Sequence, residues 1–176
     1  GFWRNGLVWR WMNLVADTHP VLHKHAIPVI RFDSELREFV DELSVFMYQC
    51  DGIGIAAPQV GDPRSIAIVD HTLGEDPNAL LVLINPEIAY VDPTEITLLE
   101  GCLTYPNIVL PIKRWQGCKV FYDSIHGQRL SLSMNGLQAR VVQHEIDHLR
   151  GVTFMNKVGP LAKSKAMKDL KRHEND

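Results

Sequence analysis

The chain has 176 residues, a formal net charge of −3 and a pI of about 6.2. This length suits one domain that buries a core without disulfides, and the charge argues against a nucleic-acid surface. No apolar run reaches the ~18 residues that a membrane-spanning helix needs. The three cysteines, Cys50, Cys102 and Cys118, are too few for a secreted disulfide framework and favour a reducing compartment.

The N-terminal residues 1–11 are rich in tryptophan and arginine and lack the apolar centre of a signal peptide. Met12 is a candidate natural start, with residues 1–11 either left over from expression or a native extension. Residues 12–176 are expected to form a single domain that ends in a basic tail helix from about Leu161. Within this domain, residues 19–31 contain two prolines and no helical period, which predicts an extended segment.

The first predicted helix spans Ser34–Gln49. Asp33 or Ser34 can cap its first turn. Apolar residues then recur at three- and four-residue steps, which gives the helix one apolar face made of Leu36, Phe39, Val40, Leu43, Phe46 and Met47. Asp51 and Gly52 predict that the helix ends near Cys50.

The middle of the chain is rich in short apolar runs. They predict strands at 65–70, 79–85, 87–91, 95–99, 119–124 and 129–133. His126-Gly127, between the last two runs, is a hairpin signal. The period becomes helical from about Gly136 to Arg150, and this helix is apolar on nearly every side, so we expect it to be buried. The sequence therefore predicts an α+β fold in which a mostly antiparallel, partly split sheet surrounds the buried C-terminal helix.

That helix carries His144-Glu145-Ile146-Asp147-His148, an HExxH motif. Four residues along a helix turn through ~400°, so the two histidines lie only ~40° apart around the axis and ~6 Å apart along it. Both rings can therefore meet one metal ion. Glu145 points about a quarter-turn away, where a general base can reach a water. Asp147 can pair with Arg140 or Arg150, or orient a histidine ligand.

A chance match, with hydrogen-bonded core histidines, is the alternative interpretation. Metal binding is favoured because burying two imidazoles and two carboxylates without partners would cost several kcal/mol. A catalytic site usually needs three protein ligands and an open position. Downstream there is no HxxGxxH continuation, and His173 and Glu174 lie in the polar tail. We therefore expect the third ligand to come from upstream.

Two upstream segments are unusual: Gly52–Gly61 (GIGIAAPQVG) and Glu100–Pro106 (EGCLTYP), which places a cysteine beside a glycine. Together with QHEIDH at Gln143–His148 they resemble the three motifs of the peptide deformylase family, GxGxAAPQ, EGCLS and QHExDH, in the same order. The resemblance runs from about residue 15 to residue 158. Thr104 and Tyr105 stand where the family more often has a serine and an aliphatic residue, which bears on side-chain preference.

The resemblance implies a single catalytic domain that removes the N-formyl group from the initiator methionine of nascent polypeptides and releases formate. It implies that Cys102, His144 and His148 bind one divalent metal, Fe(II) in the cell, with Ni, Co or Zn in purified members. The implied partners are formyl-methionyl peptides and, through the basic tail, the ribosome exit region, with no nucleic-acid specificity and no membrane. The implied location is the bacterial cytoplasm or an organellar matrix.

The resemblance also implies the roles of individual residues. Glu145 would move the proton between water and the leaving amine. The side-chain amide of Gln59 and the backbone N–H of Leu103 would stabilise the oxyanion. The peptide substrate is implied to lie extended beside Gly54 and its neighbours, which gives three substrate-binding residues: Ile53, Gly54 and Gly101.

Two other classes of protein stay open. An ordinary HExxH zinc peptidase would use a different third ligand, and its metal binding would survive the loss of Cys102. A non-catalytic protein with a structural metal would have four protein ligands and a closed site. In that protein Glu145 would have no chemical role.

Overall fold

The structure is a computed structural model that describes residues 3–4, 7–8 and 12–174. Most of the expected extension at 1–11 lies outside the described residues; within it, β1 (Trp3–Arg4) and β2 (Leu7–Val8) form a short antiparallel pair. The remaining strands form one antiparallel sheet in sequence order: β3 (Gly54–Ala56), β4 (Ile66–Val69), β5 (Leu81–Cys102), β6 (Tyr105–Asp123) and β7 (Arg129–Asn135). The helices are α1 (Ser34–Gln49), α2 (Gly136–Leu149) and α3 (Pro160–Glu174), with 3-10 turns η1 (Pro20–His23), η2 (Ala57–Val60) and η3 (Phe154–Lys157).

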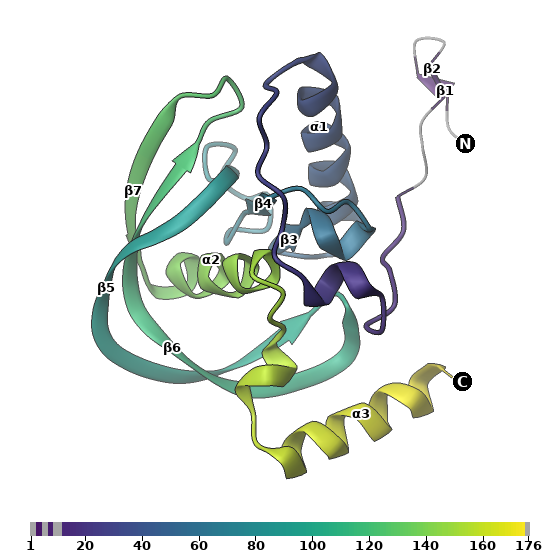
Figure 1. Cartoon of the computed structure of the whole chain (residues 1–176). Coiled ribbons are helices and arrows are strands. Elements are labelled where there is room, and N and C mark those ends of the chain that lie inside the picture. Colours follow the sequence, from purple (N-terminus) through teal and green to yellow (C-terminus); the bar gives the residue numbers. More distant parts are fainter. Residues whose placement is uncertain (1–2, 5–6, 9–11, 175–176) are drawn as a thin grey trace.

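Strands β5 and β6 form a long hairpin that curves around α2 (Figure 1). The separate strands predicted at 79–85, 87–91 and 95–99 are largely parts of this single strand β5. Register shifts between Ile84 and Glu87 and between Asp92 and Glu95 coincide with the two prolines that interrupt the sequence pattern. Bulges accommodate proline in a sheet and bend the strand, so the interruptions curve β5 instead of ending it.

Helix α2 is buried as expected, and strand β4 lies between the core around α2 and a second core around α1. Strand β4 is buried along its whole length: Ala67 and Val69 pack in the cluster around α2, whereas Ile66 and Ile68 pack in the cluster around α1. The α+β fold with a mostly antiparallel sheet around this helix is confirmed. None of the helices in the described ranges has the length and apolar character needed to cross a membrane.

Helix α1 has the predicted bounds, and Asp33 is its cap, since its carboxylate accepts a 3.0 Å hydrogen bond from the N–H of Leu36. The helix ends at Cys50, followed by Asp51 with a φ of 56°. Its C-terminal end leads directly into the segment that begins at Gly52. This segment passes beside α2, so α1 fixes one wall of the site described below.

Two segments differ from the sequence prediction. Residues 19–31 are not extended throughout, because η1 forms where Pro20 occupies the first helical position and the His19 ring accepts a hydrogen bond from the N–H of Val21. The tail helix α3 has core contacts that the sequence analysis did not predict. Ala166 and Leu170 are buried in a cluster with residues of β6 and η3, so one face of α3 is part of the core.

Candidate metal centre

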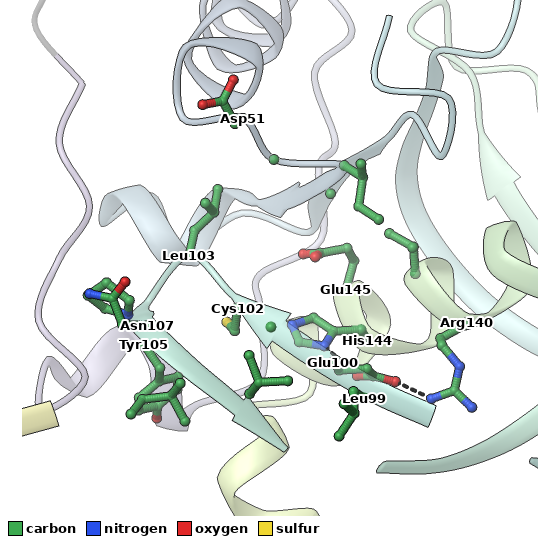
Figure 2. Close-up of a pocket in the computed structure, with 18 of the residues that line it drawn as sticks. Asp51, Leu99, Glu100, Cys102, Leu103, Tyr105, Asn107, Arg140, His144 and Glu145 are labelled. Carbon is green, nitrogen blue, oxygen red and sulfur yellow. Dashed lines mark hydrogen bonds and ion pairs between the residues drawn. The ribbon is translucent and has the colours of Figure 1, made fainter. Parts of the chain in front are cut away.

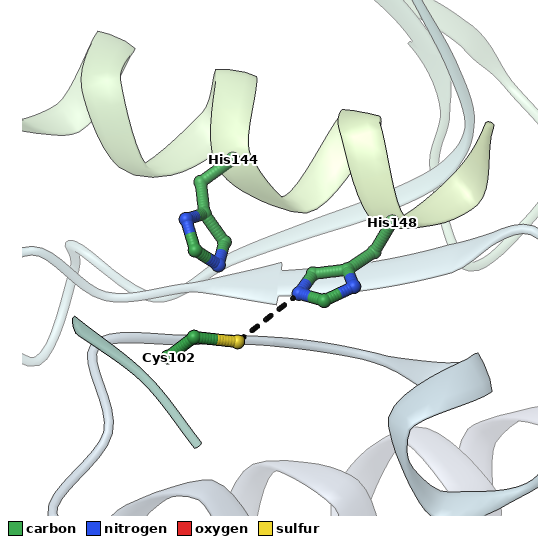
Figure 3. Close-up of side chains that lie close together, drawn as sticks. All are labelled: Cys102, His144 and His148. Carbon is green, nitrogen blue, oxygen red and sulfur yellow. Dashed lines mark hydrogen bonds between the residues drawn. The ribbon is translucent and has the colours of Figure 1, made fainter. Parts of the chain in front are cut away.

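Three side chains from two elements converge on one point (Figure 3). His144 and His148 project from successive turns of α2, and Cys102 stands at the end of β5. Their potential ligand atoms all lie within 4.8 Å of one another. The Cys102 Sγ lies 3.4 Å from the Nε2 of His148, and both histidines are buried. The structure thus brings together the cysteine and the two histidines that the sequence analysis selected.

The spacing of these atoms fits a tetrahedral metal site. With metal–sulfur distances of about 2.3 Å and metal–nitrogen distances of about 2.0–2.1 Å, tetrahedral ligands place sulfur and nitrogen about 3.5 Å apart. The observed 3.4 Å between Cys102 and His148 matches this value. Three protein ligands would leave one tetrahedral position free, as in catalytic sites, whereas closed structural sites use four protein ligands.

Glu100 fixes the orientation of the first histidine. The Nδ1–H of His144 donates to the Glu100 carboxylate at 2.9 Å, which leaves Nε2 to face Cys102. The same carboxylate accepts two hydrogen bonds from Arg114, at 2.7 and 2.9 Å, and one from Arg140 at 2.6 Å. Glu100 belongs to the predicted EGCLTYP segment, but the sequence analysis assigns it no role in the site. Sequence reasoning missed it because its partners are distant in the chain.

The charges around the site favour a cation. Burial alone would lower the pKa of His144, but the Cys102 sulfur and the Glu100 carboxylate raise it to about 10. Burial would likewise raise the pKa of Glu100, yet hydrogen bonds from His144 and Arg114 lower it to about 2. These groups stabilise positive charge on His144, whereas burial and the charges of His144 and Arg114 lower the pKa of His148. Two imidazoles, a thiol sulfur and a carboxylate that supports one ring form a donor set that fits a metal.

Asp147 has different partners from those expected. It pairs with Arg114 at 2.8 Å and with Lys157 at 3.5 Å, and not with Arg140 or Arg150. Because Arg114 also holds Glu100, Asp147 supports His144 through two intermediates and does not touch a histidine itself. The expected pairing was wrong because Arg140 is held by Glu100 and by two carbonyl oxygens of the hairpin.

Glu145 projects from α2 next to the histidines but stands apart from their ion-pair network. It is 3% exposed, and its Oε2 has no hydrogen-bond partner among the described residues. Burial is the main cause that raises its pKa to about 7. The backbone of Gly54 passes beside it, so close that a Cβ there would lie 2.8 Å from Glu145 Oε1. Glu145 is thus held next to the three potential ligands with an unpaired oxygen.

A cavity of about 450 Å³ opens beside these side chains (Figure 2). Glu145, His144 and Cys102 contribute to its lining, and so do four of the five residues expected to contact substrate or oxyanion: Ile53, Gly54, Gly101 and Leu103. Most of the remaining wall is apolar, including Leu99, Ile108, Val109, Leu137 and Val141. The pocket can therefore take an apolar side chain while its polar end faces Glu145 and Cys102.

Gln59 lies behind Cys102 rather than in the pocket wall. It is buried in η2, and its Nε2 lies 3.7 Å from the Cys102 Sγ and 3.1 Å from the Thr104 hydroxyl. Its Oε1 accepts the N–H of Ala56 at 2.9 Å. The amide nitrogen is thereby turned toward the candidate metal centre.

The other two cysteines lie elsewhere. Cys50 caps the C-terminal end of α1, and Cys118 is buried within β6, where burial raises the pKa of its thiol to about 11. Neither belongs to the group of potential ligands found among the described residues.

An HExxH helix meets a cysteine from a neighbouring strand, beside a buried glutamate with a free oxygen. These features define the class of this protein, which is a metallohydrolase. Comparisons with known proteins give the family. The polypeptide deformylase family model matches residues 11–164. The peptide deformylases of Thermotoga maritima and Wolinella succinogenes are 40% and 36% identical over 80% and 92% of this chain, and over 83% and 96% of theirs.

Solved structures agree with this match. A peptide deformylase from Legionella pneumophila superposes with a TM-score of 0.88 at 29% identity, covering 93% of this chain and 95% of that one. A peptide deformylase from Synechococcus elongatus in complex with actinonin gives 0.86 at 38% identity, covering 93% and 89%. The chain belongs to the peptide deformylase family, and the resemblance seen in its three motifs is confirmed.

We predict that Cys102→Ala removes most of the bound metal, whereas Cys50→Ala and Cys118→Ala retain it, because only Cys102 places its sulfur near both histidines. Metal per chain, measured by elemental analysis of freshly purified variants, checks the prediction. The two other cysteines are the matched controls. Equal metal loss in either control, in a protein that is still folded by circular dichroism, would contradict it.

We also predict that Gly54→Ala lowers hydrolytic turnover by about 10²-fold, the cost of displacing a reacting group by roughly 1 Å. The added Cβ would lie 2.7 Å from Val141 Cγ1 and 2.8 Å from Glu145 Oε1, so Glu145 has to move. Turnover and metal content are measured together. Gly159→Ala is the control, because a Cβ at Gly159 meets nothing within 4 Å. Unchanged turnover in Gly54→Ala would show that the position of Glu145 is unimportant.

Proposed function

We propose that this protein hydrolyses the N-formyl group of formyl-methionyl peptides and releases formate and a free amino terminus. One observation carries the proposal: the convergence of Cys102, His144 and His148 beside the unpaired oxygen of Glu145, at the polar end of an apolar pocket. Membership of the peptide deformylase family supplies the reaction class.

The metal would be held by Cys102, His144 and His148. When bound, it supplies Lewis acidity at a position open to substrate. A soft thiolate with two imidazoles admits Fe(II), Zn, Co or Ni, and we propose Fe(II) in the cell, with Ni, Co or Zn in the purified protein. Glu100 supports this assignment, since its hydrogen bond to Nδ1 leaves Nε2 of His144 available.

Glu145 is proposed to take the proton of the attacking water and to deliver it to the leaving amine. Its support is geometric, because its free Oε2 is buried beside the three ligands, while every oxygen of Glu100 is already paired. Oxyanion charge would be met by the Gln59 amide and the backbone N–H of Leu103, which follows Cys102 directly. Preorganised donors of this kind contribute about 3 kcal/mol each.

The peptide would lie beside Ile53, Gly54 and Gly101, with the methionine side chain in the apolar part of the pocket. Gly54 leaves no room for added atoms, because the Glu145 and Val141 side chains already fill the space where its Cβ would be. Formyl is the smallest acyl group, so this crowding admits it and disfavours larger acyl groups.

Two further proposals concern the partner of the basic helix α3 and the cellular compartment. The solvent-facing side of α3 exposes five basic side chains, which suit the negatively charged surface near the ribosome exit: Lys163, Lys165, Lys168, Lys171 and Arg172. Since formylated chains arise where translation starts on formyl-methionine, we propose the bacterial cytoplasm or an organellar matrix as the compartment.

The proposed function predicts that formyl-Met peptides are hydrolysed with a kcat/KM about 10- to 200-fold above that of acetyl-Met peptides, since one extra methyl group in a tight pocket costs roughly 1–3 kcal/mol. Formate release and free amine are measured on the Fe(II)-loaded protein, with an internally cleavable peptide as a third substrate. Comparable rates on acetyl and formyl substrates would refute the proposal. Faster cleavage of the internal peptide bond would favour the zinc-peptidase alternative.

Replacing Glu145 separates catalysis from metal binding. Glu145→Gln keeps the shape of the side chain but cannot accept a proton, so turnover should fall by about 10²–10⁴-fold. Metal content and thermal unfolding should stay close to those of the parent protein, because Glu145 is not a ligand in this arrangement. Loss of metal in a folded Glu145→Gln protein would contradict the assigned role.

A further inference from the structure

Thr104 lies in the two-residue turn between β5 and β6, two residues after Cys102. Its side chain is buried at 7% exposure and faces Gln59, which is 1% exposed. The Gln59 Nε2 donates to the Thr104 Oγ1 at 3.1 Å and lies 3.7 Å from the Cys102 Sγ. The amide nitrogen is therefore held by the threonine on one side and faces the cysteine on the other.

The two ends of the Gln59 amide are fixed by different constraints. A backbone N–H can only donate, so the N–H of Ala56, 2.9 Å away, requires the oxygen of Gln59 at that end. The opposite end carries two N–H groups. One of them is bound to Thr104, and the other faces the Cys102 Sγ, its acceptor at 3.7 Å. A valine at 104 would have the same shape but no acceptor, so the nitrogen end of the amide would keep only its long contact with the Cys102 sulfur.

We propose that Thr104 is a positioning residue, whose hydroxyl orients the Gln59 side chain so that one amide N–H is presented to the reacting carbonyl oxygen beside Cys102. The inference deepens the proposed function and rests on it, since it assumes that Gln59 stabilises the oxyanion. Threonine here keeps the hydroxyl of the serine that is commoner in the family. Preorganisation is the reason that such a contact matters: a donor contributes to catalysis only if it already points at the place where charge develops.

The test compares three substitutions at two positions. Thr104→Val removes the hydroxyl at constant shape, Thr104→Ser keeps it, and Gln59→Ala removes the donor. Thr104→Val should lower kcat about tenfold, as expected for one buried hydrogen bond, and Gln59→Ala about 10²-fold. KM should change little, because the contact acts on the transition state. Thr104→Ser should restore kcat to within about twofold of the parent.

A double-substitution cycle separates positioning from structure. If Thr104 acts through Gln59, adding Thr104→Val to Gln59→Ala should cause no further loss of kcat. Thr153→Val is the matched control, since Thr153 is also buried and its hydroxyl accepts a 3.2 Å hydrogen bond from Tyr105. It should lower thermal stability without lowering kcat. An undiminished effect of Thr104→Val in the Gln59→Ala background, or a Thr104→Ser protein as impaired as Thr104→Val, would overturn the proposal.

A second readout does not depend on activity. In the metal-free protein, the side-chain NH₂ group of Gln59 is assigned in ¹H–¹⁵N spectra by its absence in Gln59→Ala. Thr104→Val should shift these signals and speed their exchange with water, whereas Thr104→Ser should not. Unchanged signals in Thr104→Val would overturn the proposal. If the parent protein released no formate, the proposed function would fail. These spectra would still decide whether Thr104 orients the Gln59 amide.

Discussion

The buried carboxylate of Glu100 is the interaction on which the site depends. It receives hydrogen bonds from Arg114 on β6 and from Arg140 and His144 on α2. An unpaired charge at this depth would cost several kcal/mol, and removing one partner of a buried pair typically costs 3–5 kcal/mol. The network therefore sets one register between the β5–β6 hairpin and α2. Cys102 follows Glu100 by two residues, so the same register brings its sulfur to the two histidines.

The buried polar side chains of α2 explain why the sheet is curved. Helix α2 carries two histidines, an acid and an arginine that are buried, and each needs a partner or a ligand supplied by neighbouring strands. A flat sheet would contact one side of the helix only. The bulges at the prolines bend β5 and β6 around α2, so that its polar groups meet residues of the hairpin while its apolar groups pack on β4.

Local patterns were sufficient for the elements that they encode directly. Helix α1 has its predicted bounds because its cap and period lie within the segment, and the histidine stripe of α2 follows from helical geometry alone. The continuity of β5 was not predictable, since a proline indicates the end of a strand unless the pairing with the partner strand is known. The roles of Glu100 and Arg114 were missed for a similar reason: their contacts join residues 14 to 44 positions apart, and no short window contains both partners.

Two glutamates near the same histidines have opposite environments, and this difference supports the roles proposed for them. Hydrogen bonds from cationic partners lower the pKa of Glu100 to about 2 despite its burial, so it stays ionised and cannot exchange protons near neutral pH. Glu145 is buried with one oxygen unpaired, and burial raises its pKa to about 7. Such a separation of pKa values is typical of a site that pairs a structural anion with a proton carrier, the role proposed for Glu145. A Cβ at Gly54 would lie 2.8 Å from Glu145 Oε1, so glycine at this position leaves the Glu145 carboxyl the space that its proposed role requires.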